Sequence, residues 1–229
     1  LESLNVSVYK IPSGEITNLP LLTHVARKQR PILLSTGMST LDEVGAAVRT
    51  ITAAGNHELV LLHCVSNYPA DPADANLRAM QTMEDAFGVP VGYSDHTMGI
   101  DVALAAAALG ACVIEKHLTL DRRRPGPDHM SSAEPGELAA LVRGVRIIAS
   151  ALGHGRKEPA ASEAEVARIA RKSVVAARVI ETGTALTLDD LVMRRPGTGL
   201  PARALPELIG RVASRRIAEG TVLTLEMLR

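Results

Sequence analysis

The feature that most constrains the fold is a regular alternation of short apolar runs with amphipathic runs over the first 152 residues. The apolar runs have the length of buried strands, and apolar residues recur at helical spacing in the segments between them. Strand-like runs lie at 6–11, 31–35, 58–64, 90–94 and 111–117, and helix-like segments at 17–29, 40–54, 75–87, 99–109 and 134–152. Strands that alternate with helices form parallel sheets, so the pattern predicts a (β/α) barrel or a doubly wound sheet.

Polar side chains gather at the positions where the strand-like runs end. They are Lys10 and Ser13, residues 35–36, residues 63–68, residues 94–96 and residues 115–117. The carboxyl ends of parallel strands meet at one edge of a sheet, and both barrels and doubly wound sheets bind ligands there. The sequence therefore predicts one site that several strands share.

Two of these strand ends carry a histidine. Because side chains on a strand alternate between faces, Glu115 and His117 share one face of their strand. Ser94 and His96 share one face of the preceding strand. Neighbouring parallel strands lie about 4.8 Å apart, so the two imidazoles could converge on one divalent cation. Glu115 or Asp128 could be a third ligand or act through bound water, and a hydrogen-bonded structural role is the alternative for each histidine.

Hydroxyl groups and one lysine at the strand ends could hold an anion. Ser35 and Thr36 precede a predicted helix, whose N-terminus could bind phosphate or simply be capped by a side chain. Lys10 could pair with an anion, form a Schiff base or lie in solvent. Three more polar side chains precede a proline turn: Ser66, Asn67 and Tyr68. They could bind a phosphate or a polyol, or they could belong to an ordinary turn that binds no ligand.

The composition excludes several kinds of partner. The chain has 25 Lys plus Arg and 25 Asp plus Glu, so we expect no broad attraction to nucleic acid or to an anionic membrane. The longest apolar stretch, residues 99–114, contains Asp101 and several glycines and alanines, which indicates helix, turn and strand rather than a membrane span. Cys64 and Cys112 lie in apolar runs, where we expect buried free thiols and a cytoplasmic location.

The pattern changes after a segment rich in Gly, Pro, Ala and charged residues. The sequence IETGTALTLDDLV at 180–192 is echoed by IAEGTVLTLEMLR at 217–229. Each copy is predicted to form a strand, a turn at Gly183 or Gly220, a second strand and a short helix, which suits a compact β-rich module. The predicted division is a barrel-type domain at 1–152, a linker at 153–165 and a small domain at 166–229.

Several longer motifs occur in a fixed order along the chain. They are KIPSGE, LSTGM, HCVSNYP, GYSDHT, ALGACVIEKHLTLD, GPDH and RRPGTG. In these motifs the chain resembles the sialic acid synthase (N-acetylneuraminate synthase) family, which includes legionaminate, pseudaminate and spore-coat polysaccharide relatives. The resemblance implies the C-terminal part, about five βα units, of a (β/α)₈ TIM barrel followed by a SAF (antifreeze-like) domain.

The resemblance also implies an activity and roles for single residues. The family condenses phosphoenolpyruvate with an N-acyl sugar aldehyde such as N-acetylmannosamine, using Mn²⁺ or Mg²⁺, and releases a nonulosonic acid and phosphate. His96 and His117 match metal ligands, and Glu115 and Asp128 match acids near the reacting carbons. Arg195 matches an arginine that a SAF domain places over the sugar in the partner barrel of a homodimer. Groups that match the phosphoenolpyruvate site are Lys10 as an electrostatic clamp, Ser13, Ser35, Ser66, Tyr68 and, close by, Ser94.

Two departures from the family remain. Some members have Asn where this chain has Ser66, so the role of Asn67 is open. The first three or so barrel strands of the family have no counterpart, so we expect a fragment with two unpaired sheet edges that is inactive or poorly folded alone. The alternatives are another phosphoenolpyruvate-dependent aldol-type synthase and an inactive fragment whose SAF module binds carbohydrate or a partner.

Overall fold

The computed structural model describes residues 2–229, and the chain divides into two compact units. The units are Leu1–Gly155 and Arg156–Arg229. Among the described residues, no helix is long and apolar enough to cross a membrane.

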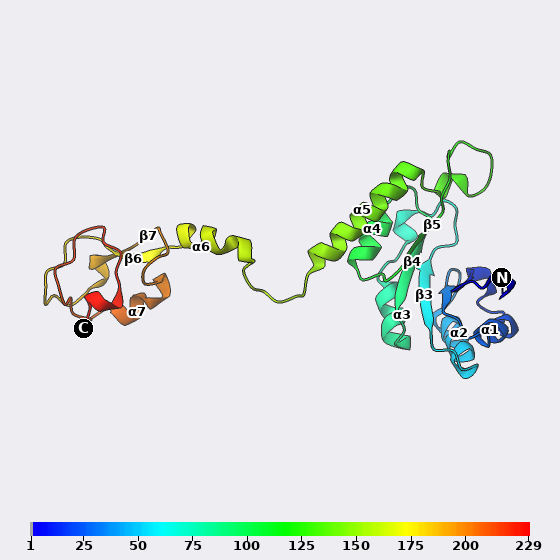
Figure 1. Cartoon of the computed structure of the whole chain (residues 1–229), viewed down its shortest axis with the longest axis horizontal. Coiled ribbons are helices and arrows are strands. Elements are labelled where there is room, and N and C mark those ends of the chain that lie inside the picture. Colours follow the sequence, from blue (N-terminus) through cyan, green and yellow to red (C-terminus); the bar gives the residue numbers. More distant parts are fainter. Residues whose placement is uncertain (1) are drawn as a thin grey trace. The chain divides into compact units, whose positions relative to one another are not determined.

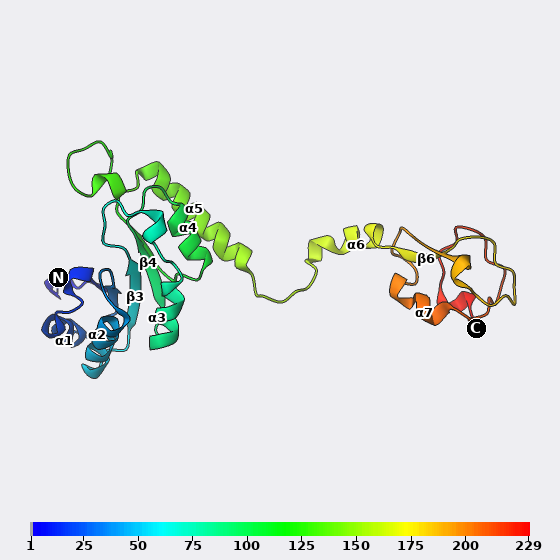
Figure 2. The same cartoon turned by 180° about the vertical axis from the view of Figure 1, so that it is seen from behind.

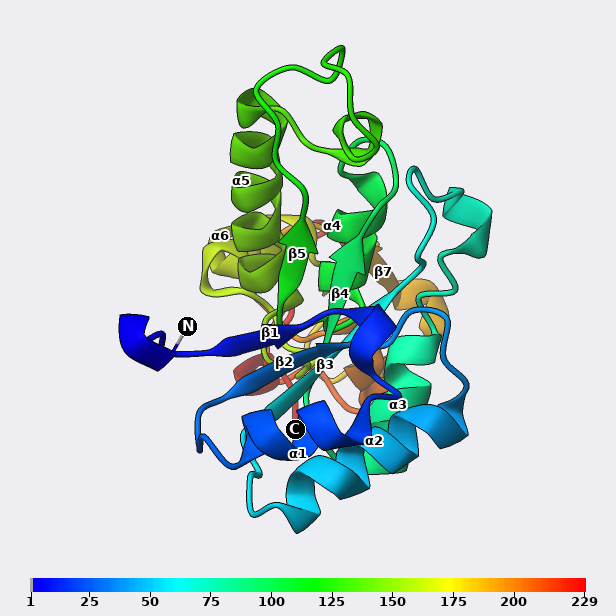
Figure 3. The same cartoon turned by 90° about the vertical axis from the view of Figure 1, so that its right-hand side faces the viewer.

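The first unit is a curled, fully parallel five-stranded sheet with helices between its strands (Figure 1). The strands are neighbours in chain order: β1 Tyr9–Ile11, β2 Ile32–Ser35, β3 Leu59–Cys64, β4 Val91–Asp95 and β5 Ile114–Lys116. The helices are α1 Leu19–Ala26, α2 Leu41–Ala53, α3 Ala79–Phe87, α4 Asp101–Ala108 and α5 Pro135–Leu152. Short 3-10 turns lie at Glu2–Leu4, Ser13–Glu15, Pro72–Asp74 and His129–Ser131. This order confirms the partial barrel over the doubly wound alternative (Figure 3).

The core of this unit lies between the sheet and the helices. Leu34 on β2 and Leu61 on β3 are fully buried, as are Leu22 on α1 and Ile51 on α2. Parallel strands covered by helices require such apolar side chains, which explains the near-continuous apolar runs in the sequence. A capping box of Thr40 with the residue three positions on begins α2, as a helix start requires.

Two sequence expectations need correction in this unit. The helix predicted from residue 75 begins only at Ala79, because a 3-10 turn and the left-handed Asn76, with a φ of 40°, interrupt the chain. Cys64 is buried as expected, but Cys112 is exposed, and both thiols are free. Cys112 precedes β5, which pairs with β4 alone, so the edge of the sheet leaves it open to solvent.

The second unit (Figure 2) contains two antiparallel strands and a core of its own. Its elements are β6 Ser173–Ala176, β7 Leu191–Arg194, α6 Ala164–Ala170, α7 Leu205–Leu208 and 3-10 turns at Ala161–Glu163, Leu188–Asp190, Ala202–Ala204 and Leu225–Met227. The predicted short helix of each repeat copy is therefore a single 3-10 turn. The copies pair symmetrically, since Ile180 and Ile217 each donate a backbone hydrogen bond of 2.9 Å to the other. Gly183 and Gly220, at φ values of 82° and 77°, make the predicted turns.

Candidate functional site

A cavity of about 430 Å³ opens at the carboxyl edge of the parallel sheet. All five strand ends, or the loops that follow them, contribute to its wall. The lining residues are Lys10, Pro12, Ser13, Gly14, Ser35, Met38, Cys64, Ser66, Tyr68, Ser94, His96, Glu115 and His117. The structure thus brings together all of the predicted site residues except Thr36, Asn67, Asp128 and Arg195.

The curl of the sheet brings its first and last strands together across this cavity. The ammonium group of Lys10, on β1, lies 3.3 Å from Oε1 of Glu115, on β5. The hydroxyl of Ser94, on β4, donates to the same carboxylate oxygen at 2.7 Å. Ser94 and Glu115 are register partners of the β4–β5 pair, so strand pairing alone sets their contact. Glu115 is therefore held between a cation and a hydroxyl at the wall of the cavity.

Hydroxyl groups converge on one backbone position beside Lys10. The amide of Gly37 donates to the Ser13 hydroxyl at 2.9 Å, and the Cys64 sulfur lies 3.2 Å from that hydroxyl. A Cβ at Gly37 would lie only 2.3 Å from the Ser66 hydroxyl oxygen, so glycine permits this close approach. The Ser35 hydroxyl is buried and has no hydrogen-bond partner in the described part of the chain. Buried hydroxyls normally have a partner, so the cluster is arranged to receive a ligand or water.

Two imidazoles lie close together in the wall of the same cavity, one edge-on to the other. The ring centroids of His96 and His117 are 5.3 Å apart, and the Tyr68 ring lies 4.2 Å from His96 and 5.6 Å from His117. Nδ1 of His96 lies 2.7 Å from the carbonyl oxygen of Val65. A carbonyl only accepts, so Nδ1 carries the proton and Nε2 keeps its lone pair. Burial lowers the pKa of His96, which the Val65 carbonyl partly opposes, and burial raises the pKa of Tyr68.

The two imidazoles can supply part of the coordination shell of a divalent cation. An imidazole that donates from one nitrogen to a carbonyl is oriented as metal-binding histidines usually are. Asp128 Oδ2 lies 3.9 Å from Nδ1 of His117. No group of three or more His, Cys, Asp or Glu side chains is arranged to hold a metal within residues 2–229. A cation held by His96 and His117 would need further ligands, such as water or substrate oxygens.

Four predicted residues lie outside the cavity wall. Thr36 lines a second cavity instead, and its hydroxyl donates to the Leu62 carbonyl at 3.1 Å. Asn67 is exposed between two lining residues. Asp128 is exposed, and its backbone carbonyl accepts hydrogen bonds from Ser131 at 3.0 Å and Ser132 at 2.6 Å. Arg195 belongs to the second unit, where it is exposed and its Nε donates to the Ala170 carbonyl at 3.1 Å. Asp128 thus stays close to the imidazoles, whereas the structure does not test the site assigned to Arg195.

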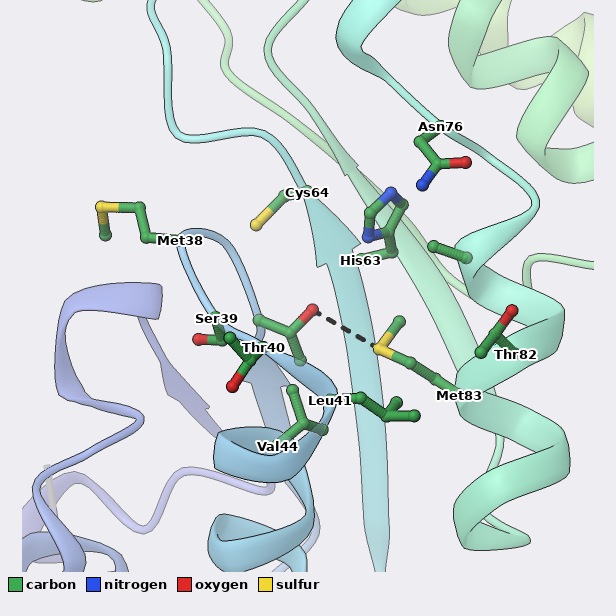
Figure 4. A pocket seen from close by; sticks show the side chains of 12 residues that line it. Met38, Ser39, Thr40, Leu41, Val44, His63, Cys64, Asn76, Thr82 and Met83 are labelled. Atoms are coloured by element: carbon green, nitrogen blue, oxygen red, sulfur yellow. Dashed lines mark hydrogen bonds between the residues drawn. The ribbon is translucent and has the colours of Figure 1, made fainter.

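A second cavity, of about 490 Å³, lies behind β3 between α2 and α3 (Figure 4). It shares Met38 and Cys64 with the first cavity, but no Asp, Glu, Lys or Arg side chain lines it. His63 Nε2 lies 2.8 Å from the Ala75 carbonyl oxygen, and burial lowers the pKa of this histidine. This cavity is larger than the first, but among the described residues it has no carboxylate, ammonium or guanidinium group in its wall that could bind a charged substrate.

Sequence reasoning missed two features of the first site. Met38 and Cys64 line its wall, and the motifs that contain them give only a weak signal of this. Asp95 and Lys116 form a buried ion pair behind it, with a nitrogen–oxygen distance of 2.7 Å. The alternation of faces places both residues on the outer side of the sheet, but their contact depends on register, which one strand alone does not reveal.

Comparison with known proteins agrees with this architecture. The model of the NeuB family matches residues 1–157, and that of the SAF domain matches residues 171–229. The chain is 45% identical to N,N'-diacetyllegionaminic acid synthase of Legionella pneumophila, over 99% of this chain and 65% of that protein. It is 40% identical to human N-acetylneuraminate-9-phosphate synthase, over 95% of this chain and 60% of that protein. The chain thus spans roughly two thirds of these relatives or less.

Solved structures give the same assignment. A crystal structure of N-acetylneuraminic acid synthetase from Leptospira borgpetersenii is 44% identical, with a TM-score of 0.68 over 72% of this chain and 58% of that chain. A crystal structure of a spore coat polysaccharide biosynthesis protein from Chromobacterium violaceum is 27% identical, with a TM-score of 0.77. That match covers 100% of this chain and 69% of that chain. The chain belongs to the NeuB family and carries a SAF domain at residues 171–229.

Proposed function

We propose that the protein condenses phosphoenolpyruvate with an N-acyl sugar aldehyde, N-acetylmannosamine or an analogue, to a nonulosonic acid and phosphate. The observation that carries this proposal is the cavity whose wall unites Lys10 and a hydroxyl cluster with Glu115 and two imidazoles. The names of the relatives, N,N'-diacetyllegionaminic acid, pseudaminic acid and N-acetylneuraminate-9-phosphate synthases, support the same class of reaction.

The hydroxyl cluster and Lys10 are proposed to hold the phosphoryl and carboxylate groups of phosphoenolpyruvate. Ser13, Ser35 and Ser66 offer hydroxyl donors, and hydrogen bonds to charged acceptors are the stronger kind. Lys10 acts as an ammonium point charge beside them, without forming a covalent bond to the substrate. These contacts fix the vinyl carbon of the substrate in place, which lowers the entropic part of the barrier.

The bond changes assign a role to the acids. The vinyl carbon of phosphoenolpyruvate bonds to the aldehyde carbon, water adds to the neighbouring carbon, and phosphate departs with its oxygen as the keto group forms. The attacking water must lose a proton, and the Glu115 carboxylate, held by Ser94 and Lys10, is positioned to accept it. The aldehyde oxygen takes up one proton to become a hydroxyl, and Asp128, close to His117, is proposed to deliver it. The second proton of the water leaves with the phosphate.

A divalent cation, Mn²⁺ or Mg²⁺, would polarise the aldehyde oxygen and so raise the reactivity of the carbonyl toward the weakly nucleophilic vinyl carbon. His96 and His117 are the residues that would hold it. The hydrogen bond from His96 to Val65 fixes that ring and leaves Nε2 free to bind. Tyr68 packs against both rings and limits their rotation.

The second unit is proposed to act on the site of a partner chain. Arg195 is exposed on a loop of this unit. One N–H of its guanidinium donates to the Ala170 carbonyl, and its other N–H groups are proposed to donate to the sugar. In a homodimer, the SAF domain of one chain would cover the barrel of the other. Arg195→Ala should then raise the KM for the sugar and leave the KM for phosphoenolpyruvate unchanged.

Phosphate release from phosphoenolpyruvate, N-acetylmannosamine and Mn²⁺ tests the proposed function. The assay should be run on this chain and on the complete product of its gene, with Glu115→Gln as the inactive control. We expect release that requires both substrates and stops when a chelator removes the metal. Absence of release from the complete product with every N-acyl hexosamine tested contradicts the proposal.

A further inference from the structure

An ion pair lies on the outer side of the sheet, directly behind the two imidazoles. Asp95 stands between Ser94 and His96, and Lys116 stands between Glu115 and His117. Asp95 and Lys116 are register partners of the β4–β5 pair, one position beyond Ser94 and Glu115. The two strands are therefore joined by side chains on both faces at successive positions.

The outer pair is buried and makes several hydrogen bonds. The Lys116 side chain is 2% exposed and that of Asp95 is 0% exposed, with Nζ and Oδ2 2.7 Å apart. The other oxygen of Asp95 accepts from the amide of Thr97 at 3.0 Å and from its hydroxyl at 2.8 Å. Lys116 also donates to the carbonyl of Thr97. Helix α4 packs against β4 and β5.

These contacts hold the residues on both sides of His96. Lys116 binds Asp95, which precedes His96, and Thr97, which follows it. Lys116 itself directly precedes His117. One side chain thus connects the backbone that carries the first imidazole to the backbone that carries the second.

We propose that the Asp95–Lys116–Thr97 cluster is a positioning device that sets the separation and orientation of His96 and His117 for a shared cation. The proposal rests on the function proposed above. A buried ion pair gains little stability over an apolar pair of similar size, because desolvation of the two charges offsets their attraction. Its hydrogen bonds are directional, however, and they fix the backbone on both sides of His96, which, like His117, lies just beyond the last register pair of the two strands.

A double variant, compared with a control variant, separates an effect on the position of the imidazoles from an effect on stability. The double variant Asp95→Leu/Lys116→Met replaces the pair by apolar side chains of similar size. The amide, hydroxyl and carbonyl groups of the buried Thr97 lose their partners in this variant, so we expect its urea midpoint to fall. We expect its affinity for Mn²⁺, measured by calorimetry, to fall about 10- to 100-fold, as when groups that orient metal ligands are removed.

The matched control is Asn56→Leu. Asn56 is a buried polar residue that precedes β3, at the opposite edge of the same sheet, and it binds the Arg30 carbonyl at 2.9 Å. Its loss should lower stability without changing Mn²⁺ affinity. Should the double variant fail to fold, Thr97→Val removes only the hydroxyl bond to Asp95 and should weaken Mn²⁺ binding about two- to tenfold, the range of one hydrogen bond.

Three outcomes overturn the proposal. Wild-type Mn²⁺ affinity in the folded double variant, or in Thr97→Val if only that variant folds, overturns it and leaves the proposed function intact. An equal loss of affinity in Asn56→Leu also overturns it, because the effect would then follow general destabilisation. Absence of Mn²⁺ binding to the wild-type complete gene product overturns both proposals together.

Discussion

Replacement of Gly37 by alanine would place a methyl group inside the hydroxyl cluster. The added Cβ would lie 2.3 Å from the Ser66 oxygen, 2.9 Å from the Ser13 oxygen and 3.0 Å from the Cys64 sulfur. All three atoms are ends of side chains that can rotate, so the fold can yield at a cost of about 1–3 kcal/mol. The hydroxyls that move away, however, are the ones proposed to hold the substrate phosphate.

The expected loss of affinity follows from one displaced donor. A hydrogen bond to a charged acceptor contributes about 1.5–3 kcal/mol, and each 1.4 kcal/mol is tenfold in binding, so Gly37→Ala should weaken phosphoenolpyruvate binding about 10- to 150-fold. Calorimetry measures the affinity, and urea unfolding checks that the variant remains folded. Gly136→Ala is the matched control, since a Cβ at Gly136 would meet nothing within 4 Å. Wild-type affinity in Gly37→Ala refutes the anion site.

Two further predictions test the folding of each unit. Leu61→Ala empties a fully buried position on β3 and should cost about 2–5 kcal/mol in urea unfolding; a loss below about 1 kcal/mol contradicts the packing described here. A hydrogen bond from Thr187, aided by Arg178, holds the pKa of Asp190 below its usual 3.8. The stabilisation that the Asp190 carboxylate contributes is therefore present above pH 3.8 and is lost as the pH falls through its folded-state pKa. Asp190→Asn should flatten the acid-induced fall in the Tm of the second unit. A fall that is unchanged in this variant refutes the stabilising role of Asp190.

The alternation of side chains was enough to predict the inward face of the site. It placed Ser94 and His96 on one face of β4 and Glu115 and His117 on one face of β5, and all four line the cavity. The reason is that strand periodicity and the carboxyl edge of a parallel sheet are both local consequences of the sequence pattern.

Other features depended on contacts that no local pattern contains. The Asp95–Lys116 pair needs the register of two strands, and the approach of Lys10 to Glu115 needs the curl of the whole sheet. The late start of α3 depends on the left-handed Asn76, a conformation that asparagine permits but does not require. Arg195 lies in a unit that folds around its own core, so the site it serves cannot be read from its own surroundings.

The imidazoles of His96 and His117 are proposed to bind one cation beside the anion site. Pulsed electron paramagnetic resonance of bound Mn²⁺, with ¹⁵N-labelled histidine, counts the imidazole nitrogens that coordinate the ion. We predict coupling to two histidines in the wild type and to one in His117→Ala, with weaker Mn²⁺ binding and nearly unchanged stability because the residue lies at a strand end. Bound Mn²⁺ without histidine coupling, or a spectrum that His117→Ala leaves unchanged, contradicts the claim.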